Sequence, residues 1–298
     1  MKFLGTASVS AVVALLMLTG CSEDARQAAP HVVVGAMAEV SGASKGFFVT
    51  DGQPTYHDWN AGFGNIIEPL EGAHAASFHA FAQPKNAMAL FARDRKHVYM
   101  AVSYTPREIT GADAKSFSLI TNDGLYAKDA KHVYFLGVPI LEANPLTFEV
   151  LMYPFSQDKE DAFIGAAPIP NVDRESWRPL REGWADDCWE RSANVIRPKP
   201  QESIHVNGWS RDANAFYYGR EAISGIDVAT FEVLSDYYAK DKNNVYSQHY
   251  GKLVAIKNAD ASTFVVHEDA EEILGRPRGA DAHDANSQYR DGKVFNAN

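Results

Sequence analysis

Short stretches of apolar and aromatic residues alternate with polar, turn-forming residues along most of the chain. Runs rich in Val, Tyr, Phe and Trp flank polar centres of Asp, Asn and Lys, which is typical of β-hairpins. The pattern therefore predicts an all-β fold built from tandem hairpins.

One nine-residue pattern recurs: an aromatic, a small and a basic residue, then Asp, any residue, Lys or Asn, any residue, an apolar residue and Tyr. Clear copies are residues 91–99, 126–134, 209–217 and 238–246; a weaker copy begins at residue 282, and a degenerate one lies within 45–52. The Asp side chain can accept a hydrogen bond from a backbone amide two residues later, which starts a turn. We expect Asp129, Asp212 and Asp241 to hold hairpins together and to bind no ion.

A second motif, Asp or Asn followed four residues later by Phe, comes after each clear copy of the first. Its copies are residues 113–117, 144–148, 227–231 and 260–264, with a similar segment at 74–78. Asn144 before Pro145 suits the start of a helical turn. The interval from the Asp of the first motif to this Phe is 19 residues in two copies and 23 in the other two. Two motifs linked in this way indicate a structural repeat.

Each unit is then roughly three strands in about 30 residues, close to known repeat periods. One unit cannot bury its own aromatic face, so neighbouring units must stack. We expect tandem β-hairpin or three-stranded repeats in a propeller-like or elongated, meandering array, and the pattern does not decide between these two.

An interruption is expected near residues 153–206, which hold six prolines together with Trp177, Trp184 and Trp189. It is an elaborated loop or a degenerate unit. Because function concentrates in such segments, it is the best candidate for a binding surface. The alternative is that its tryptophans pack a small core.

Residues 241–246, Asp-Lys-Asn-Asn-Val-Tyr, resemble the signature of the DKNYY family, a group of bacterial, often exported repeat proteins. The resemblance covers roughly residues 91–151 and 209–266. The copies depart from the signature at His97, His132 and Ala215, and Phe216 replaces Val in one of them. The resemblance implies the repeat architecture and carries no particular activity.

The N-terminus has the form of a secretory signal. Lys2 precedes the uncharged apolar run 3–18, and residues 18–21, Leu-Thr-Gly-Cys, form a lipobox-like sequence. We predict a signal peptide over 1–20, lipidation of Cys21, a tether over 21–30 and a repeat region over 31–298. Ser22 after the cysteine favours the outer membrane, facing the periplasm, over the inner membrane.

Composition is that of a globular protein, with 46% hydrophobic and 22% charged residues. The formal net charge of −10 disfavours nucleic acid as a partner and leaves basic proteins, cations and neutral glycans open. Once Cys21 carries lipid, Cys188 is the one cysteine left in the sequence, so no intrachain disulfide is expected.

No sequence motif for catalysis stands out: HExxH, Gly-rich phosphate loops and GxSxG do not occur in the chain. His97 and His132 are interpreted as solvated turn residues, and the spacing of His74 and His79 misses that of helical metal ligands. The acidic pairs 186–187 and 271–272 are more simply explained as solvated surface. We therefore predict no catalytic, cofactor-binding or metal-binding residue and no enzymatic activity.

The leading functional hypothesis is a membrane-anchored envelope lipoprotein with a non-enzymatic repeat domain that binds a protein or glycan or has a structural role. One alternative is an immunity or inhibitor protein that neutralises a toxin or hydrolase. Another is a hydrolase of cell-wall or polysaccharide substrates that uses carboxylates scattered among the repeats.

Overall fold

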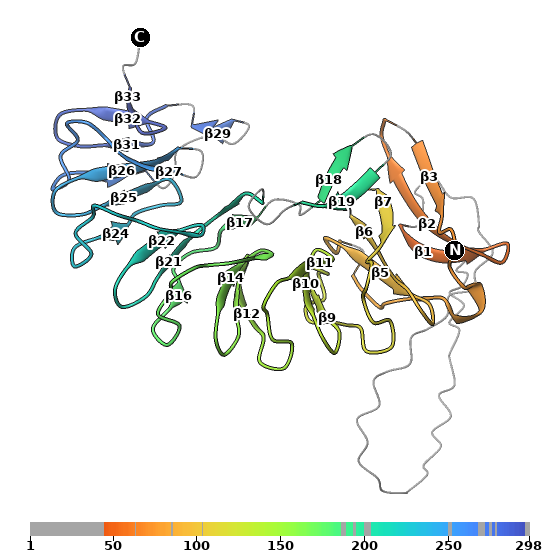
Figure 1. Ribbon diagram of the computed structural model, residues 1–298. Coiled ribbons are helices and arrows are strands. Elements are labelled where there is room, and N and C mark those ends of the chain that lie inside the picture. Colours follow the sequence, from red (N-terminus) through yellow and green to blue (C-terminus); the bar gives the residue numbers. More distant parts are fainter. Residues whose placement is uncertain are drawn as a thin grey trace, which may run out of the picture.

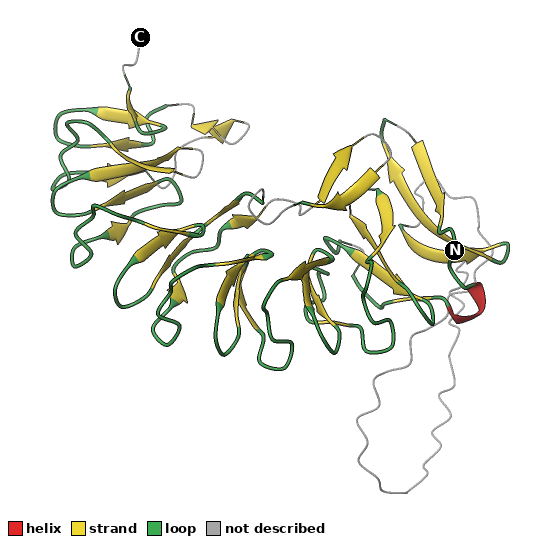
Figure 2. Cartoon of the chain, in the orientation of Figure 1, coloured by secondary structure: helices red, strands yellow, loops and turns green. Residues whose placement is uncertain are grey.

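The chain forms an open, curved array of short antiparallel strands (Figure 1). The computed structural model describes residues 45–62, 64–84, 86–102, 104–185, 189–192, 195–199, 204–249, 252–267, 272–273, 276–277 and 279–295. Across these ranges the one helical element is a 3-10 turn, η1 (Ala75–Ser77), as Figure 2 shows. The predicted all-β repeat class is confirmed, and the array is open.

Six four-stranded sheets succeed one another along the described part of the chain, and we number them units 1 to 6. Unit 1 consists of β4 (His79–Ala80), β5 (Leu90–Arg93), β6 (Val98–Val102) and β7 (Thr105–Glu108). Unit 2 consists of β8 (Ser118–Leu119), β9 (Tyr126–Lys128), β10 (Val133–Phe135) and β11 (Val138–Ile140). Unit 3 consists of β12 (Glu149–Met152), β13 (Phe155–Gln157), β14 (Ala162–Ile164) and β15 (Ala167–Pro168). Unit 4 consists of β16 (Arg178–Pro179), β21 (Trp209–Arg211), β22 (Phe216–Tyr218) and β23 (Glu221–Ala222). Unit 5 consists of β24 (Glu232–Val233), β25 (Tyr238–Lys240), β26 (Val245–His249) and β27 (Lys252–Ala255). Unit 6 consists of β28 (Val265–Val266), β31 (Ala282–His283), β32 (Gln288–Arg290) and β33 (Lys293–Val294).

Each unit has four strands where the sequence predicted about three. The first strand follows the second motif, the next two form the hairpin of the first motif, and the fourth follows a tight turn. In unit 2 this turn is Leu136–Gly137, whose φ angles are 47° and 74°, as a two-residue type I′ turn requires. A Cβ atom on Gly137 would also lie 2.8 Å from Sδ of Met100. Glycine is needed there both for the turn and for the close packing of unit 1.

Aromatic side chains join neighbouring units. Phe117 of the second motif in unit 2 has its ring centroid 5.7 Å from Phe91 of unit 1 and 5.7 Å from Tyr134 of its own unit. Phe148 lies in the same way between Tyr126 and Phe163, and Phe264 lies between Tyr238 and Tyr289. Neighbouring units thus bury the sheet faces that they turn towards each other, as expected for units that cannot fold alone.

The two ends of the array differ from its middle. A sheet of β1 (Gly46–Thr50), β2 (Gln53–Asn60) and β3 (Gly64–Pro69) covers unit 1, with Phe47 packed on Phe78 at 6.3 Å. At the other end, unit 6 has Asp281 where units 1 to 5 have a buried aromatic residue, and its Gln288 and Arg290 are exposed. A polar outer face is the usual mark of a terminal repeat.

Unit 3 lies inside the segment in which an interruption was expected. Its hairpin, β13–β14, carries the sequence Phe-Ser-Gln-Asp-Lys-Glu-Asp-Ala-Phe over residues 155–163, a divergent first motif. Residues 173–177 are the second motif of unit 4, with Trp177 in place of Phe. The insertion is therefore confined to the chain between β16 and β21.

The insertion contains two small pairs of strands. β17 (Trp184–Ala185) pairs with β20 (Val206–Asn207), and β18 (Trp189–Ser192) pairs with β19 (Val195–Pro198). In Figure 1 they lie on the inner side of the arc. A further pair, β29 (Glu272–Ile273) and β30 (Arg276–Pro277), lies between β28 and β31 of unit 6.

Candidate functional site

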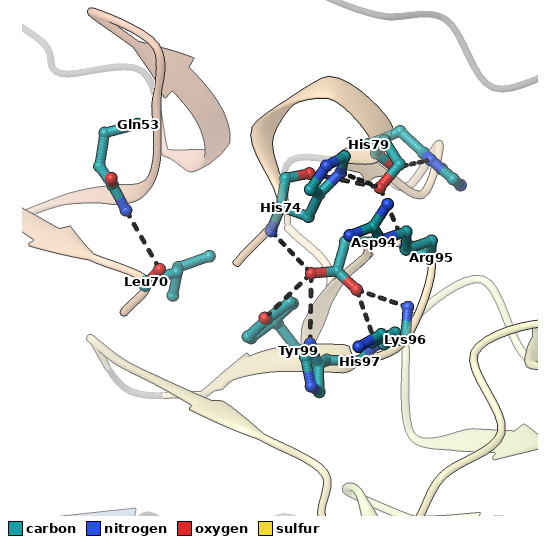
Figure 3. A network of polar contacts seen from close by, with 10 residues as sticks. Gln53, Leu70, His74, His79, Asp94, Arg95, Lys96, His97 and Tyr99 are labelled. Carbon is teal, nitrogen blue, oxygen red and sulfur yellow. Dashed lines mark hydrogen bonds and ion pairs between the residues drawn. The ribbon is translucent and has the colours of Figure 1, made fainter. Parts of the chain in front are cut away.

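The Asp of the first motif is buried in all six units and joins two loops of its sheet. In unit 2, Oδ1 of Asp129 accepts from the backbone N–H groups of Lys131 and His132, both at 2.7 Å. Its Oδ2 accepts from the N–H of Asp113 at 3.0 Å and from the hydroxyl of Tyr134 at 2.6 Å. Figure 3 shows the equivalent network around Asp94 in unit 1. The same backbone bonds recur at Asp158, Asp212, Asp241 and Asp284.

A bond in the opposite direction accompanies each of these carboxylates. The residue after Asp129, Ala130, donates its N–H to Oγ of Ser116 at 3.0 Å, and Lys242 donates in the same way to Oγ1 of Thr230 at 3.1 Å. Units 1, 3, 4 and 6 have this bond as well. The two motifs recur together because each donates a backbone hydrogen bond to a side chain of the other. The second motif belongs to the sheet of the first motif that comes after it in the chain.

Burial and hydrogen bonding act in opposite directions on these carboxyls. Burial alone would raise their pKa, but the donated hydrogen bonds outweigh it, and the pKa is lowered for Asp94, Asp129, Asp212, Asp241 and Asp284. Burial and the bond to Asp284 raise the pKa of Tyr289 to about 12. The recurrent acids are thus ionised groups that hold the repeat together.

The histidines considered as ligands contact side chains of their own unit. Nδ1 of His97 lies 3.3 Å from Oδ2 of Asp94, and Nδ1 of His132 lies 3.6 Å from Oδ1 of Asp129. Nδ1 of His74 contacts Oγ of Ser77 at 2.8 Å, and Nε2 of His79 accepts from Arg93 at 2.8 Å. Among the described residues, no three His, Cys, Asp or Glu side chains come together as metal ligands would.

The three tryptophans of the expected interruption have different environments. Trp177 is buried in unit 4, where its ring is 6.0 Å from that of Phe155. Trp189 is buried against units 1 and 2: its Nε1–H donates to the carbonyl of Leu136 at 2.8 Å, and the Arg107 guanidinium lies 4.5 Å from its ring centroid. Trp184 is 50% exposed. Two of the three rings therefore form core, and one remains at the surface.

Local backbone geometry fixes the position of Trp184. Trp184 pairs with Asn207 and Ala185 pairs with Val206 in the β17–β20 ladder. Ala185 is buried, so alternation along the strand places the Trp184 ring on the opposite, open side. A Cβ atom on Gly183 would lie 2.2 Å from the carbonyl oxygen of Asn207, so the close approach of the two strands depends on glycine.

A hollow of about 670 Å³ lies between this ladder and units 4 and 5. Its lining residues come from the insertion, the end of unit 3 and the inner parts of units 4 and 5: Pro170, Trp184, Ile204, His205, Val206, Asn207, Tyr218, Arg220, Glu221 and Gln248. A second hollow of about 730 Å³ shares Pro170, Arg220 and Glu221 with it and extends to the Asp212 turn. Ligand pockets are commonly about 300–1,000 Å³. The two hollows adjoin at their three shared lining residues, and we call the two together the groove.

The groove combines one exposed aromatic ring with planar polar side chains. Arg220 is oriented by its Nε–H, which donates to the carbonyl of Pro168 at 3.0 Å. Glu221 is exposed, and the amide side chains of Asn207 and Gln248 are partly exposed. A concave surface with an apolar platform and a few oriented polar groups is the form of a binding site. The sequence pointed to this segment through its tryptophans but not to Arg220, Glu221 or Gln248, which lie in ordinary repeat positions.

The predicted lipidation site, Cys21, lies outside the described residues, as do Cys188, Asp186, Asp187 and Glu271. Within the described ranges, no helix is long and apolar enough to cross a membrane.

The fold defines this chain as an open, all-β repeat protein. The model of the DKNYY family matches residues 91–293, which is more than half of the chain, and the chain belongs to this family. The match includes unit 3 and the insertion. No curated protein and no solved structure matches the chain.

Proposed function

We propose that the protein is a lipid-anchored envelope protein whose repeat array displays a non-enzymatic binding groove. The groove at Trp184 is the observation that supports this proposal. Most large aromatic rings of the chain pack in the core, whereas the Trp184 ring is exposed to water beside polar side chains, where a ligand can cover it. The lipobox-like residues 18–21 and the tether that follows support anchoring at Cys21 on the periplasmic side of the outer membrane.

Binding is favoured over catalysis by the state of the recurrent carboxylates. Each first-motif Asp accepts several hydrogen bonds from the chain itself, and a lowered pKa opposes a role as proton donor at neutral pH. These groups are used for the architecture, so a hydrolase would have to draw its acid and base from elsewhere.

The anchor is tested in cells grown with an alkyne analogue of palmitate. Wild-type protein should take up the label, and Cys21→Ser should lose it and retain the signal peptide. Equal labelling of both proteins would contradict the lipid anchor.

The groove is tested by crosslinking in the native envelope. Wild type should form an adduct that Trp184→Ala loses and Trp59→Ala keeps. Trp59 on β2 is a matched control because it is 52% exposed, against 50% for Trp184, and lies in the sheet at the opposite end of the array from unit 6. An adduct that is unaffected by Trp184→Ala would overturn the assignment of function to the groove.

A further inference from the structure

We infer that the groove at Trp184 binds a neutral oligosaccharide; this rests on the proposed binding function and names its ligand class. The first argument is the ring itself. Trp184 is 50% exposed on β17, and Ala185, the next residue of this strand, is buried in the core. An aromatic face held in this way provides a flat apolar platform with little conformational entropy to lose, and the C–H face of a pyranose ring is complementary to it.

The second argument is the set of polar groups beside the ring. Two amides, Asn207 and Gln248, and the charged pair Arg220 and Glu221 line the same hollow. Amides and carboxylates accept hydrogen bonds and amides and guanidinium groups donate them, so neighbouring hydroxyl groups of a sugar can be satisfied from both directions. A purely apolar ligand would displace water from the exposed Glu221 carboxylate without replacing its hydrogen bonds, at a cost.

Charge disfavours anionic ligands in this groove. Arg220 and Glu221 are shared by both hollows and carry opposite charges, and the second hollow adds the carboxylates of Asp173 and Asp212. An anionic chain would face these acids and a protein of net charge −10. A cationic ligand would find the Asp212 carboxylate already occupied by backbone N–H groups and the Tyr217 hydroxyl.

The length of the groove indicates an oligomer. The hollow at Trp184, about 670 Å³, shares Pro170, Arg220 and Glu221 with a second hollow of about 730 Å³. A single sugar would contact one hollow alone, whereas a short chain can stack on Trp184 and extend over Glu221 towards the Asp212 turn.

The experiment is calorimetric titration of the full-length lipoprotein in a detergent without a sugar headgroup. The probes are chitotetraose and maltoheptaose as neutral oligosaccharides, a tetragalacturonate as an anionic one, and tetra-alanine as a peptide. We expect at least one neutral oligosaccharide to bind and tetragalacturonate to bind at least about tenfold more weakly, the equivalent of about 1.4 kcal/mol. Mass spectrometry should recover the bound sugar intact.

Trp184→Ala should weaken this binding about tenfold or more, and Trp59→Ala should leave it within about twofold. Melting temperatures of both variants report folding, and Trp184→Phe, which keeps a ring, should retain most of the affinity. The inference is overturned if neither neutral sugar binds, if tetra-alanine alone binds, or if Trp184→Ala has no effect on sugar binding. An envelope adduct that Trp184→Ala does not reduce would instead count against the proposed function itself, so the two failures are distinguishable.

Discussion

The backbone N–H of Asp227 donates a hydrogen bond of 2.9 Å to Oδ2 of Asp241, joining the second motif of unit 5 to the hairpin of the same sheet. The motif pattern did not predict this bond, because each second motif was associated, from sequence, with the first motif that precedes it. In the structure the second motif bonds to the first motif that follows it. It also changes the loss of stability that we expect when Asp241 is substituted.

Asp241→Asn should be costly, although a turn-forming Asp would ordinarily tolerate Asn. One oxygen of Asn can still accept from Asn243 and Asn244, but its NH₂ group would face the Asp227 N–H. A buried donor left without an acceptor costs about 1–3 kcal/mol. We expect a loss of that size in urea unfolding for both Asp241→Asn and Asp241→Ala.

Asp236→Asn is the control, because Asp236 is exposed and its pair with Arg181 at 2.9 Å is a surface ion pair, worth about 0–1 kcal/mol. A loss for Asp241→Asn no larger than for Asp236→Asn would contradict the proposed role of the carboxylate. Both Asp241 substitutions are expected to be costly without any bound ion, so they do not test for one. A chelator tests the prediction that these Asp residues bind no ion, and it should leave the melting temperature unchanged.

A tyrosine hydroxyl donates to this carboxylate in every unit except unit 3, at 2.6–2.8 Å in units 2, 4, 5 and 6 and at 3.4 Å in unit 1. Tyr246 donates to Oδ2 of Asp241 at 2.8 Å, whereas the equivalent residue of unit 3, Phe163, is fully buried beside Asp158. Tyr246→Phe should lower the free energy of unfolding by about 1 kcal/mol. The reverse change, Phe163→Tyr, should cost less or be stabilising, and equal losses in the two variants would argue against the hydrogen bond.

Acid should unfold the protein in a pH range set by these carboxylates. Their pKa is lowered in the folded state, so their contribution is present above the unfolded value of about 3.9 and is lost as pH falls below it. Burial lowers the pKa of His57 and His79, which adds a smaller loss below about pH 6.5. Urea midpoints measured from pH 7 to pH 3 should show both losses, and the one below pH 4 should be smaller in Asp241→Asn.

Two buried serines are expected to destabilise the array. Ser156 and Ser210 are fully buried at the small-residue position of the first motif, and their Oγ atoms have no hydrogen-bond partner among the described residues. Ala92, Ala127 and Ala239 occupy this position in other units. Ser156→Ala should therefore raise the free energy of unfolding by about 1 kcal/mol, and Ala239→Ser should lower it by a similar amount. A melting temperature lowered by Ser156→Ala would show that its hydroxyl has a favourable role.

Much of this architecture could be predicted from local sequence, and the rest depends on contacts distant in sequence. The hairpin at Asp241 follows from residues 238–246 alone, because the turn bonds are made within that segment. The sequence left unit 3 open as a loop or a degenerate unit, because Gln157 and Phe163 replace the basic residue and the Tyr of its first motif and Trp177 replaces Phe in the second motif that follows. The 19-residue interval from Asp158 to Trp177 nevertheless matches other copies. Sequence alone did not show which of the two neighbouring tryptophans, Trp184 or Trp189, is exposed. The reason is that Trp189 is buried through a contact with Leu136, which lies 53 residues away in the chain.

The polar end of the array should keep the protein from polymerising. In unit 5 the side chains that face unit 6, among them Tyr238, Val245 and Ser247, are buried. The equivalent residues of unit 6 are Asp281, Gln288 and Arg290, and Asp281 is held there by bonds from the Tyr238 hydroxyl at 2.7 Å and the Asp291 N–H at 3.0 Å. An apolar face at this position would be ready to accept another repeat.

Gln288→Val combined with Arg290→Phe should therefore cause self-association through unit 6, visible in sedimentation velocity as species larger than wild type that increase with concentration. The control is Glu232→Val with Lys252→Phe, which places similar apolar side chains at exposed strand positions away from that end. If the control associates as strongly as the unit 6 variant, general surface hydrophobicity is the cause. If neither associates, the polar residues of unit 6 are not what ends the array, and the short β32–β33 hairpin limits it by shape.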